Sequence, residues 1–186
     1  MASAWQTLGP FFDRKLIHHG HDLTRAGPCR PQGEFIELAG RVLQDGGAPV
    51  PGCLIEIWQA NAAGRYAHPA DRERPLDPNF KGFGRALTDQ DGRYRFVTVK
   101  PGAVPFEGNR WQAPHILLSL FAAGLLRRLV TRLYFPDESA NESDPILATI
   151  DDPQARATLI AKADGAASYR FDVVLRGAGE TAFFVD

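Results

Sequence analysis

Three histidines near the start of the chain, His18, His19 and His21, are the first side chains whose spacing could do chemistry. Neutral imidazoles are common metal ligands. In an extended segment His19 and His21 would project from the same face and could act as a pair. Short histidine clusters are nevertheless weak compositional signals. We therefore interpret them as part of a solvated arm rather than as a metal site.

Two charged residues in apolar segments also need an explanation. Glu56 stands between two isoleucines, and a carboxylate in such a place must find a donor, because burial without one costs free energy. We expect that donor to be an arginine on a neighbouring strand. Arg132 lies in the apolar segment 129–135, where alternation turns it away from Leu129, Thr131 and Leu133. From spacing alone it is an ordinary surface cation.

The segment that presents Tyr66 begins with two strand patterns. Leu38, Gly40 and Val42 alternate with other residues, which predicts a strand with one face in a core. Residues 53–58 form an apolar, β-branched run, which predicts a strand buried on most of its surface. Turn-forming Asp, Gly and Pro separate the two patterns. The loop that follows the second strand presents Tyr66.

The rest of the chain repeats this alternation of short strands and turns. Asp152 is a good N-cap, and Pro153 suits the first helical position; they predict one helix over 152–162. The other predicted elements are a hairpin of residues 84–88 and 93–99, strands over 114–121 and 126–135, a half-exposed strand over 169–175, and a closing segment over 181–185. Many short strands with one short, late helix indicate an all-β fold, a β-sandwich. We assign residues 1–33 to an irregular N-terminal arm and 34–186 to the sandwich domain.

Composition excludes several classes of function. With 186 residues and 44% hydrophobic residues, the chain can bury one good core. Its formal net charge of −1 gives no electrostatic reason to bind nucleic acid or an anionic membrane, and no apolar run reaches the length of a membrane span. The N-terminus lacks the pattern of a secretion signal. Cys29 and Cys53 are too few for a disulfide framework, so we expect two reduced thiols in a cytoplasmic protein.

The spacing in segment 38–66 resembles the signature of the intradiol ring-cleaving dioxygenases. The likeness continues through the chain, from Thr-x-Gly-Pro at Thr7 to Gly-Glu-Thr-Ala-Phe-Phe at Gly179. Ten positions in fixed register make the signature specific. They are Leu38, Gly40, Val42, Gly47, Val50, Ile55, Glu56, Ile57, Gly64 and Tyr66.

This resemblance implies a metal centre that lacks two of its ligands. Members of the family hold a ferric ion with two tyrosinates and a His-x-His pair; the hard oxygen donors and the neutral imidazoles suit that ion. Tyr66 and His115 match two of these positions, but Val104 and Leu117 occupy the other two and have no lone pairs to offer. Gln112 replaces an arginine of the ring-cleaving relatives. We therefore predict no catalytic residue and no metal ligand in this chain, with Tyr66 and His115 left as neutral, hydrogen-bonded side chains.

The resemblance also suggests a role for the chain as a whole and for Arg132 and the N-terminal segment. It implies a catalytically incomplete subunit that pairs with a homologous chain holding Fe(III), so that the two cleave an aromatic substrate with O₂. Arg132 would reach the substrate carboxylate, and Thr7, Gly9 and Pro10 would form part of the pocket wall. Arginine suits bidentate carboxylate recognition. Segment 67–81, a long loop, and the N-terminal arm are the predicted contacts with the partner chain.

Two other functions remain open from the sequence. One is a self-sufficient catechol-type dioxygenase with substitute ligands such as His68 or His18. The other is a non-enzymatic β-sandwich binding module that kept the fold and lost the chemistry. Iron content of the chain alone separates the first from the subunit hypothesis, and a ring-cleavage assay with a partner chain separates the second.

Overall fold

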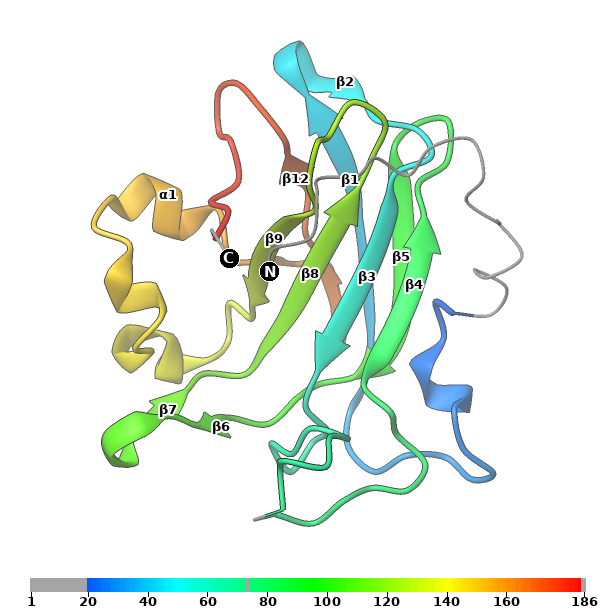
Figure 1. Cartoon of the computed structure of the whole chain (residues 1–186), viewed down its shortest axis with the longest axis vertical. Coiled ribbons are helices and arrows are strands. Elements are labelled where there is room, and N and C mark those ends of the chain that lie inside the picture. Colours follow the sequence, from blue (N-terminus) through cyan, green and yellow to red (C-terminus); the bar gives the residue numbers. More distant parts are fainter. Residues whose placement is uncertain (1–19, 73, 185–186) are drawn as a thin grey trace.

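The computed structural model describes residues 20–72 and 74–184, and it shows two β-sheets packed face to face (Figure 1). The first sheet has the order β10-β11-β1-β12, with β2 and β5 also paired to β1, and the second has the order β4-β3-β8-β9. The first consists of β1 (Phe35–Gln44), β2 (Ala48–Pro49), β5 (Arg93–Val99), β10 (Lys162–Ala163), β11 (Ser168–Arg170) and β12 (Val173–Val174). The second consists of β3 (Leu54–Gln59), β4 (Phe83–Leu87), β8 (His115–Phe121) and β9 (Leu129–Tyr134). The predicted β-sandwich is confirmed.

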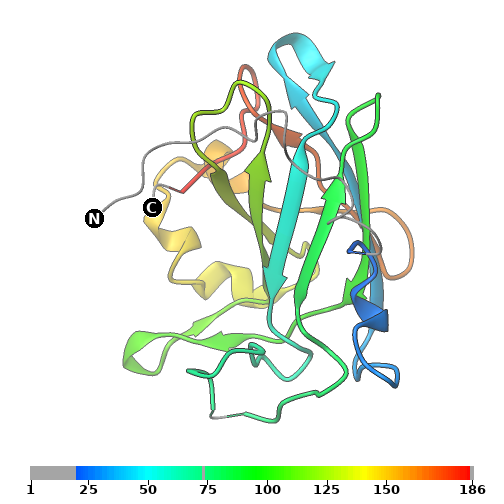
Figure 2. The same cartoon turned by 45° about the vertical axis from the view of Figure 1, so that its right-hand side comes forward.

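Short elements flank the two sheets. Strands β6 (Val104–Pro105) and β7 (Trp111–Gln112) form a separate hairpin, which lies below β8 and β9 in Figure 1. The helical pieces beside β9 are visible in both views (Figures 1 and 2). They are the 3₁₀ helices η5 (Ser139–Ser143) and η6 (Leu147–Thr149) and the α-helix α1 (Pro153–Ala157); η2 (Leu23–Arg25), η3 (Asp45–Gly47) and η4 (Glu107–Asn109) lie elsewhere.

The core lies between the sheets, and the alternation read from the sequence supplies it. In β1 the even-numbered residues from Ile36 to Val42 are buried and their neighbours are not. In β3 Ile55 and Ile57 are fully buried. Leu118 of β8 and Phe96 of β5 meet them in one hydrophobic cluster. The predicted strands over segment 38–66 are therefore confirmed.

The prediction of a hairpin over 84–88 and 93–99 is wrong. A turn does join the two segments, and the Gly92 N–H donates to the Asp89 carbonyl at 3.0 Å. However, β4 pairs with β3, and β5 pairs antiparallel with β1 along its length. The turn thus carries the chain from one sheet to the other. Turn chemistry is local, whereas each strand's partner is set by distant residues.

The predicted helix over 152–162 begins as expected but ends early. The Asp152 carboxylate accepts the Gln154 N–H at 2.8 Å, yet α1 stops at Ala157. The chain then pairs with the end of β9, because the Tyr134 N–H donates to the Leu159 carbonyl and the Ala161 N–H to the Tyr134 carbonyl, each at 2.9 Å. These two hydrogen bonds replace the ones that a longer helix would make.

The predicted strand over 169–175 is divided into β11 and β12, both parallel to β1. The break falls at Asp172, whose carboxylate, instead of a backbone carbonyl, accepts the Arg41 N–H at 2.9 Å. Just before it, the Tyr94 hydroxyl donates to the Phe171 carbonyl at 2.6 Å. A Cβ on Gly40 would stand 1.8 Å from that carbonyl oxygen, so only glycine fits there. This contact gives a physical reason for one glycine of the signature.

The N-terminal end of the described chain bonds to β4 and β5, one strand from each sheet, because the Arg85 N–H donates to the Gly20 carbonyl at 2.8 Å; the C-terminal end bonds to β9. At one end the Val97 N–H donates to the His21 carbonyl at 2.8 Å; at the other the Phe184 N–H donates to the Val130 carbonyl at 2.8 Å. The His18 and His19 of the predicted arm lie outside the described residues. In the part that is described, no helix is long and apolar enough to cross a bilayer.

Candidate functional site

Tyr66 and His115, far apart in the sequence, meet on the outer face of the second sheet. The Tyr66 hydroxyl lies 3.3 Å from His115 Nε2, and His115 Nδ1 lies 2.7 Å from the Ala113 carbonyl oxygen. Because a carbonyl oxygen can only accept, Nδ1 carries the proton and Nε2 accepts from the tyrosine hydroxyl. The Trp58 ring stacks on Tyr66 at 5.6 Å between centroids. The two side chains thus satisfy each other.

Both members of this pair are neutral at pH 7. Burial and, to a smaller extent, the nearby Arg132 charge lower the pKa of His115 to about 4. Burial also raises the pKa of Tyr66, an effect that Arg132 opposes and Asp71 reinforces. A phenol and a neutral imidazole agree with the expectation of hydrogen-bonded side chains, and a ferric ion would instead require a phenolate.

The other two positions that the family resemblance predicts for metal ligands hold apolar residues. Val104, in β6, is buried, and Leu117, in β8, is the Cα partner of both Trp58 and Arg132. We call Tyr66, Val104, His115 and Leu117 the ligand-position cluster. Among the described residues no group of three or more His, Cys, Asp or Glu could hold a metal ion. Two donors that already bond to each other do not fit Fe(III).

A cavity of about 530 Å³ opens beside the cluster. His68 lies in its wall, and the His68 Nδ1 accepts the Ala70 N–H at 3.2 Å. His18, the other substitute ligand considered above, lies outside the described residues. The lining residues are Trp58, Tyr66, His68, Ala70, Asp71, Arg72, Val104, Pro105 and Gln112. The cavity has the size of a small-molecule site.

Arg132 extends from β9 toward this cavity's Gln112. Its Nη1 donates to the Gln112 amide oxygen at 2.6 Å, and the Tyr134 hydroxyl lies 3.4 Å from the same nitrogen. The guanidinium carbon lies 5.8 Å from the centre of the Phe184 ring. As alternation predicts, Arg132 shares its face of β9 with Tyr134 and faces away from Leu133, which is in the core. It is half-buried, and is not a freely solvated surface cation.

Asp144 anchors this arrangement from the loop before η6. Its carboxylate accepts from the Tyr134 hydroxyl at 3.2 Å and from the N–H groups of Ala113, Ile146 and Leu147 at 2.7–2.8 Å. It is 1% exposed. We call Gln112, Arg132, Tyr134 and Asp144 the arginine cluster. The sequence analysis missed Asp144 and Tyr134; the Asp-Pro pair at 144–145 signals a turn but not the burial of its carboxylate.

Three further predicted site residues, Thr7, Gly9 and Pro10, lie outside the described residues. The donor to Glu56 is now identified. It is Arg85, the cross-strand neighbour on β4, whose Nε donates to the carboxylate at 2.7 Å. The expectation of an arginine on a neighbouring strand is confirmed.

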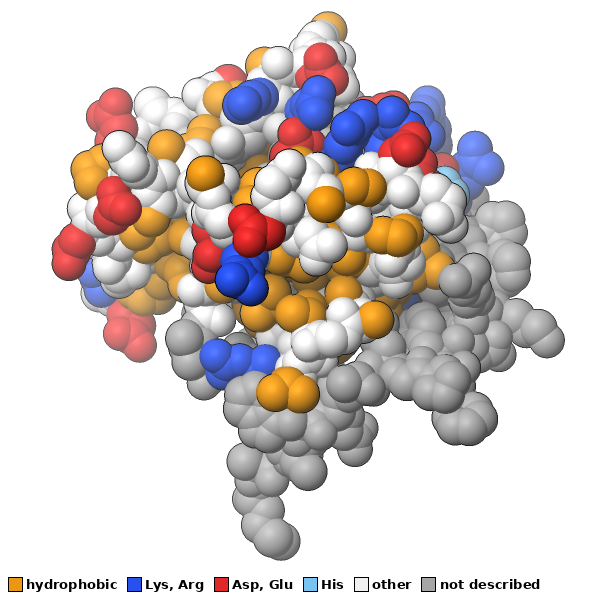
Figure 3. Space-filling model, turned by 90° about the horizontal axis from the view of Figure 1, so that it is seen from above, with side chains coloured by type: hydrophobic (Ala, Val, Ile, Leu, Met, Phe, Trp, Pro, Cys, Tyr) orange, Lys and Arg blue, Asp and Glu red, His pale blue; other side chains and the backbone are white. Residues whose placement is uncertain are grey.

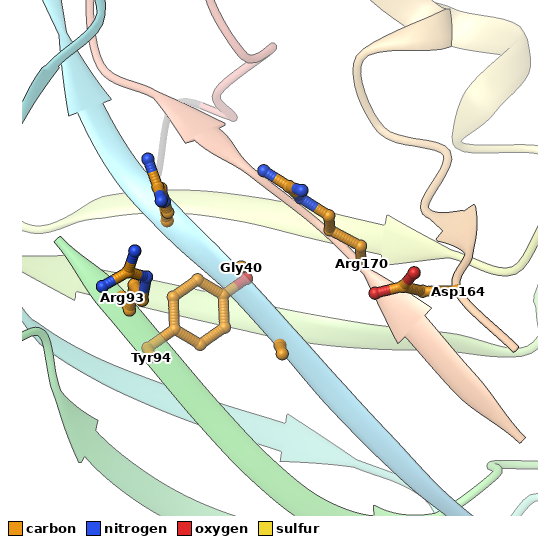
Figure 4. A pocket seen from close by; sticks show the side chains of 7 residues that line it. Gly40, Arg93, Tyr94, Asp164 and Arg170 are labelled. Carbon is orange, nitrogen blue, oxygen red and sulfur yellow. The ribbon is translucent and has the colours of Figure 1, made fainter. Parts of the chain in front are cut away.

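A second hollow, of about 200 Å³, lies on the outer face of the first sheet and contains three arginines (Figure 4). Arg41 and Arg93 are directly opposite each other on β1 and β5, and Arg170 comes from β11. Acidic groups offset these charges: Arg93 pairs with Asp91 and Arg170 with Asp172. The end of the sandwich that is seen from above likewise has acidic side chains beside basic ones (Figure 3). The hollow therefore lacks the single-sign field of an anion site.

Comparisons with known proteins agree on one family. A family model described as "Dioxygenase" matches residues 7–177. The protocatechuate 3,4-dioxygenase α chain of Pseudomonas putida is 42% identical over 96% of this chain and 94% of its own length. A β chain of the same enzyme, from Burkholderia cepacia, is 48% identical over 87% of this chain and 73% of its own length.

Solved structures show the same fold. The hydroxyquinol 1,2-dioxygenase of Pseudomonas putida DLL-E4 has a TM-score of 0.64 at 23% identity, over 95% of this chain and 68% of its own. The intradiol ring-cleavage dioxygenase of Tetranychus urticae has a TM-score of 0.63 at 18% identity, over 98% of this chain and all of its own. At these identities the likeness concerns the fold alone.

Proposed function

Because the chain belongs to the dioxygenase family, we propose that it is the α-type subunit of a protocatechuate 3,4-dioxygenase. A homologous β-type chain would hold the Fe(III), and the pair would cleave protocatechuate between its two hydroxylated carbons. Both atoms of O₂ enter the product, 3-carboxy-cis,cis-muconate. The isolated chain would be inactive.

The observation that carries this proposal is the state of the ligand-position cluster. Overall identity does not decide between the two kinds of chain, since a β chain is as similar as an α chain. Val104 and Leu117 support the α-type assignment, because they would leave two donors where the family uses four. The remaining hydroxyl and imidazole bond to each other.

Arg132 is the residue we assign to substrate recognition. It is half-buried with a fixed guanidinium, and an arginine in such a place can bind the carboxylate of protocatechuate with a charge-assisted, bidentate contact. Thr7, Gly9 and Pro10 would complete the wall of the shared pocket. The resemblance of these four positions to the α chains of the family supports the assignment.

The subunit interface would use the arm, residues 1–33, and the loop over 67–81, with residues 34–186 as the sandwich domain. Leu76 in this loop and Trp111 in the nearby β7 are each 50% exposed, and Arg74 stacks on the Trp111 ring at 4.2 Å. Aromatic side chains and arginine are enriched in interfaces. Both cysteines are free thiols, which supports a cytoplasmic location.

The test is to purify the full chain alone and together with a homologous β-type chain, and to measure iron and ring cleavage in both. We expect far less than one equivalent of iron and no cleavage for the chain alone, and both properties in the co-expressed pair. A full equivalent in the isolated chain, with a tyrosinate-to-iron charge-transfer band, would overturn the proposal.

Two variants sharpen that test. Tyr66→Phe in the assembled pair should leave iron content and activity unchanged, since Tyr66 is not a ligand in the proposed assembly. His68→Ala addresses the self-sufficient alternative, because His68 shares the cavity wall with Tyr66. Loss of iron in either variant would favour a site in this chain. A chain that ignores every homologous partner would favour the binding module.

A further inference from the structure

We propose that Gln112 and Tyr134 are positioning residues that fix Arg132 so that its Nε–Nη2 edge receives the substrate carboxylate. This inference rests on the proposed role of Arg132 in substrate recognition. It adds two residues to that role and specifies the geometry of the contact: a planar carboxylate that approaches the guanidinium from the side.

The donors of the guanidinium carry the argument. Arginine has five N–H groups in a fixed fork and no acceptor. The two on Nη1 are directed to the Gln112 amide oxygen at 2.6 Å and toward the Tyr134 hydroxyl at 3.4 Å. No described residue accepts a hydrogen bond from Nε or Nη2 of Arg132. These two nitrogens form one edge of the fork, which matches the two oxygens of a carboxylate.

Tyr134 can accept from Arg132 because its own proton is committed elsewhere. Its hydroxyl donates to the Asp144 carboxylate at 3.2 Å, which leaves the lone pairs of the phenol oxygen for the guanidinium. Three backbone N–H groups hold Asp144 in turn, and Tyr134 is fully buried. The support behind Arg132 is therefore a rigid, buried network and not another mobile side chain.

Gln112 has the chemistry that this position needs. An arginine here, as in the ring-cleaving relatives, has no acceptor and would repel Arg132. A carboxylate would accept but would also neutralise the guanidinium and compete with the substrate. The neutral amide oxygen holds Arg132 without removing its charge. Gln112 pairs with Val104 across the β6–β7 hairpin, so the hairpin that lost a metal ligand is the one that presents this acceptor.

The experiment uses the assembled enzyme with Gln112→Ala, Gln112→Glu and Tyr134→Phe. Gln112→Ala should raise KM for protocatechuate about 10-fold, because a hydrogen bond to a charged group is lost. It should leave kcat, and the kinetics with unsubstituted catechol, almost unchanged. Tyr134→Phe should act in the same direction and less strongly. Gln44→Ala, an exposed glutamine on the first sheet, is the matched control and should change nothing.

A second readout separates positioning from recognition. ¹⁵N NMR of the Arg132 Nε–H, recorded without substrate, should show an immobilised guanidinium in wild type and in Gln112→Glu, and a mobile one in Gln112→Ala. Gln112→Glu should nevertheless raise KM for protocatechuate, because its carboxylate competes. A variant that only folded poorly would not keep the guanidinium immobilised while raising KM, as is expected for Gln112→Glu.

The outcomes are distinct. An unchanged Arg132 signal in Gln112→Ala would overturn the positioning role, whatever the kinetics. A mobile guanidinium with unchanged KM for protocatechuate would uphold positioning and overturn the recognition role of Arg132. Equal effects on protocatechuate and catechol would show that Gln112 acts on the fold and not on the carboxylate contact, and would overturn the inference.

Discussion

The ligand-position cluster and the arginine cluster lie beside each other around β8 and β9, yet their polar groups are paired in different ways. In the first, Val104 and Leu117 are apolar, and Tyr66 and His115 bond to each other. In the second, the polar atoms that meet between Gln112 and Asp144 are paired in series. One region thus holds two polar groups bonded to each other beside two apolar side chains, while its neighbour holds a continuous polar network.

The difference shows that a metal site and a buried hydrogen-bond network respond differently to substitution of one residue. A metal site fails once too few ligands remain, and an apolar side chain in place of a donor leaves nothing unpaired. Replacing a buried carboxylate that accepts from several donors, by contrast, leaves each of those donors without an acceptor. The clusters are also coupled, since the Arg132 charge lowers the pKa of His115. A fixed cation so close would oppose the binding of a second one.

The largest effect should come from removing the anchor of the arginine cluster. Asp144→Ala leaves three N–H groups and the Tyr134 hydroxyl without an acceptor in a buried place. We expect the free energy of unfolding to fall by about 3–5 kcal/mol, measured by urea denaturation. Tyr66→Phe, in the other cluster, removes one long hydrogen bond and should cost about 1 kcal/mol or less. Similar losses for the two variants would contradict the comparison.

The next effect is the pH dependence that His115 adds to stability. Its pKa is about 4 in the folded chain, against 6.5 as the ordinary value. The unfolded chain therefore binds the proton more tightly, so this stabilisation is complete above pH 6.5 and is lost as the pH falls toward 4. A difference of this size corresponds to about 3 kcal/mol.

Urea denaturation of wild type and His115→Gln between pH 7 and pH 4 checks this expectation. The variant should lose less stability than wild type over that range. Parallel curves for the two proteins would mean that His115 is not held neutral, and the ligand-position cluster would then not be a closed hydrogen-bonded pair.

Arg132 should have a smaller effect in free energy, but one confined to the carboxylate. Arg132→Ala in the assembled enzyme should reduce kcat/KM for protocatechuate by roughly 10- to 150-fold, as a charge-assisted hydrogen bond contributes about 1.5–3 kcal/mol. Most of the loss should fall on KM, because the carboxylate is remote from the carbons being cleaved. Unsubstituted catechol should be far less affected.

Arg132→Lys provides the matched control for charge. It keeps the cation and loses the fork geometry, so its kcat/KM should lie between wild type and Arg132→Ala. Kinetics of Arg132→Ala equal to wild type with protocatechuate would return Arg132 to the status of an ordinary cation.

The smallest effect should follow from adding donors at the two apolar positions of the ligand-position cluster. Val104→Tyr with Leu117→His returns the donor types of the family, and the cavity beside Val104 offers room for a larger ring. With Arg132 still in place, we expect iron to stay well below one equivalent in metal analysis, because the cation opposes Fe(III). Adding Arg132→Gln should raise the iron content. Full loading without that third change would show that the two clusters are independent.

The sequence by itself determined the features that depend on near neighbours. Alternation placed Leu38 and Ile57 in the core, Asp152 capped the helix, and Glu56 required a donor that proved to be the arginine across the strand pair. The apolar character of positions 104 and 117 was also legible, because residue type alone decides whether a side chain has a lone pair to offer a metal. Residue type and periods of two or 3.6 residues carry this information locally.

Only the tertiary structure decided which distant residues meet. In it, β4 and β5 belong to different sheets. Helix α1 ends shortly before Leu159, which pairs with Tyr134, and Gln112 lies against Arg132. Each outcome depends on competition between partners far apart in the chain, where a hydrogen bond to one neighbour excludes another. A local sequence pattern carries no information about that competition. The geometry of the site could therefore be known only from the packed sheets.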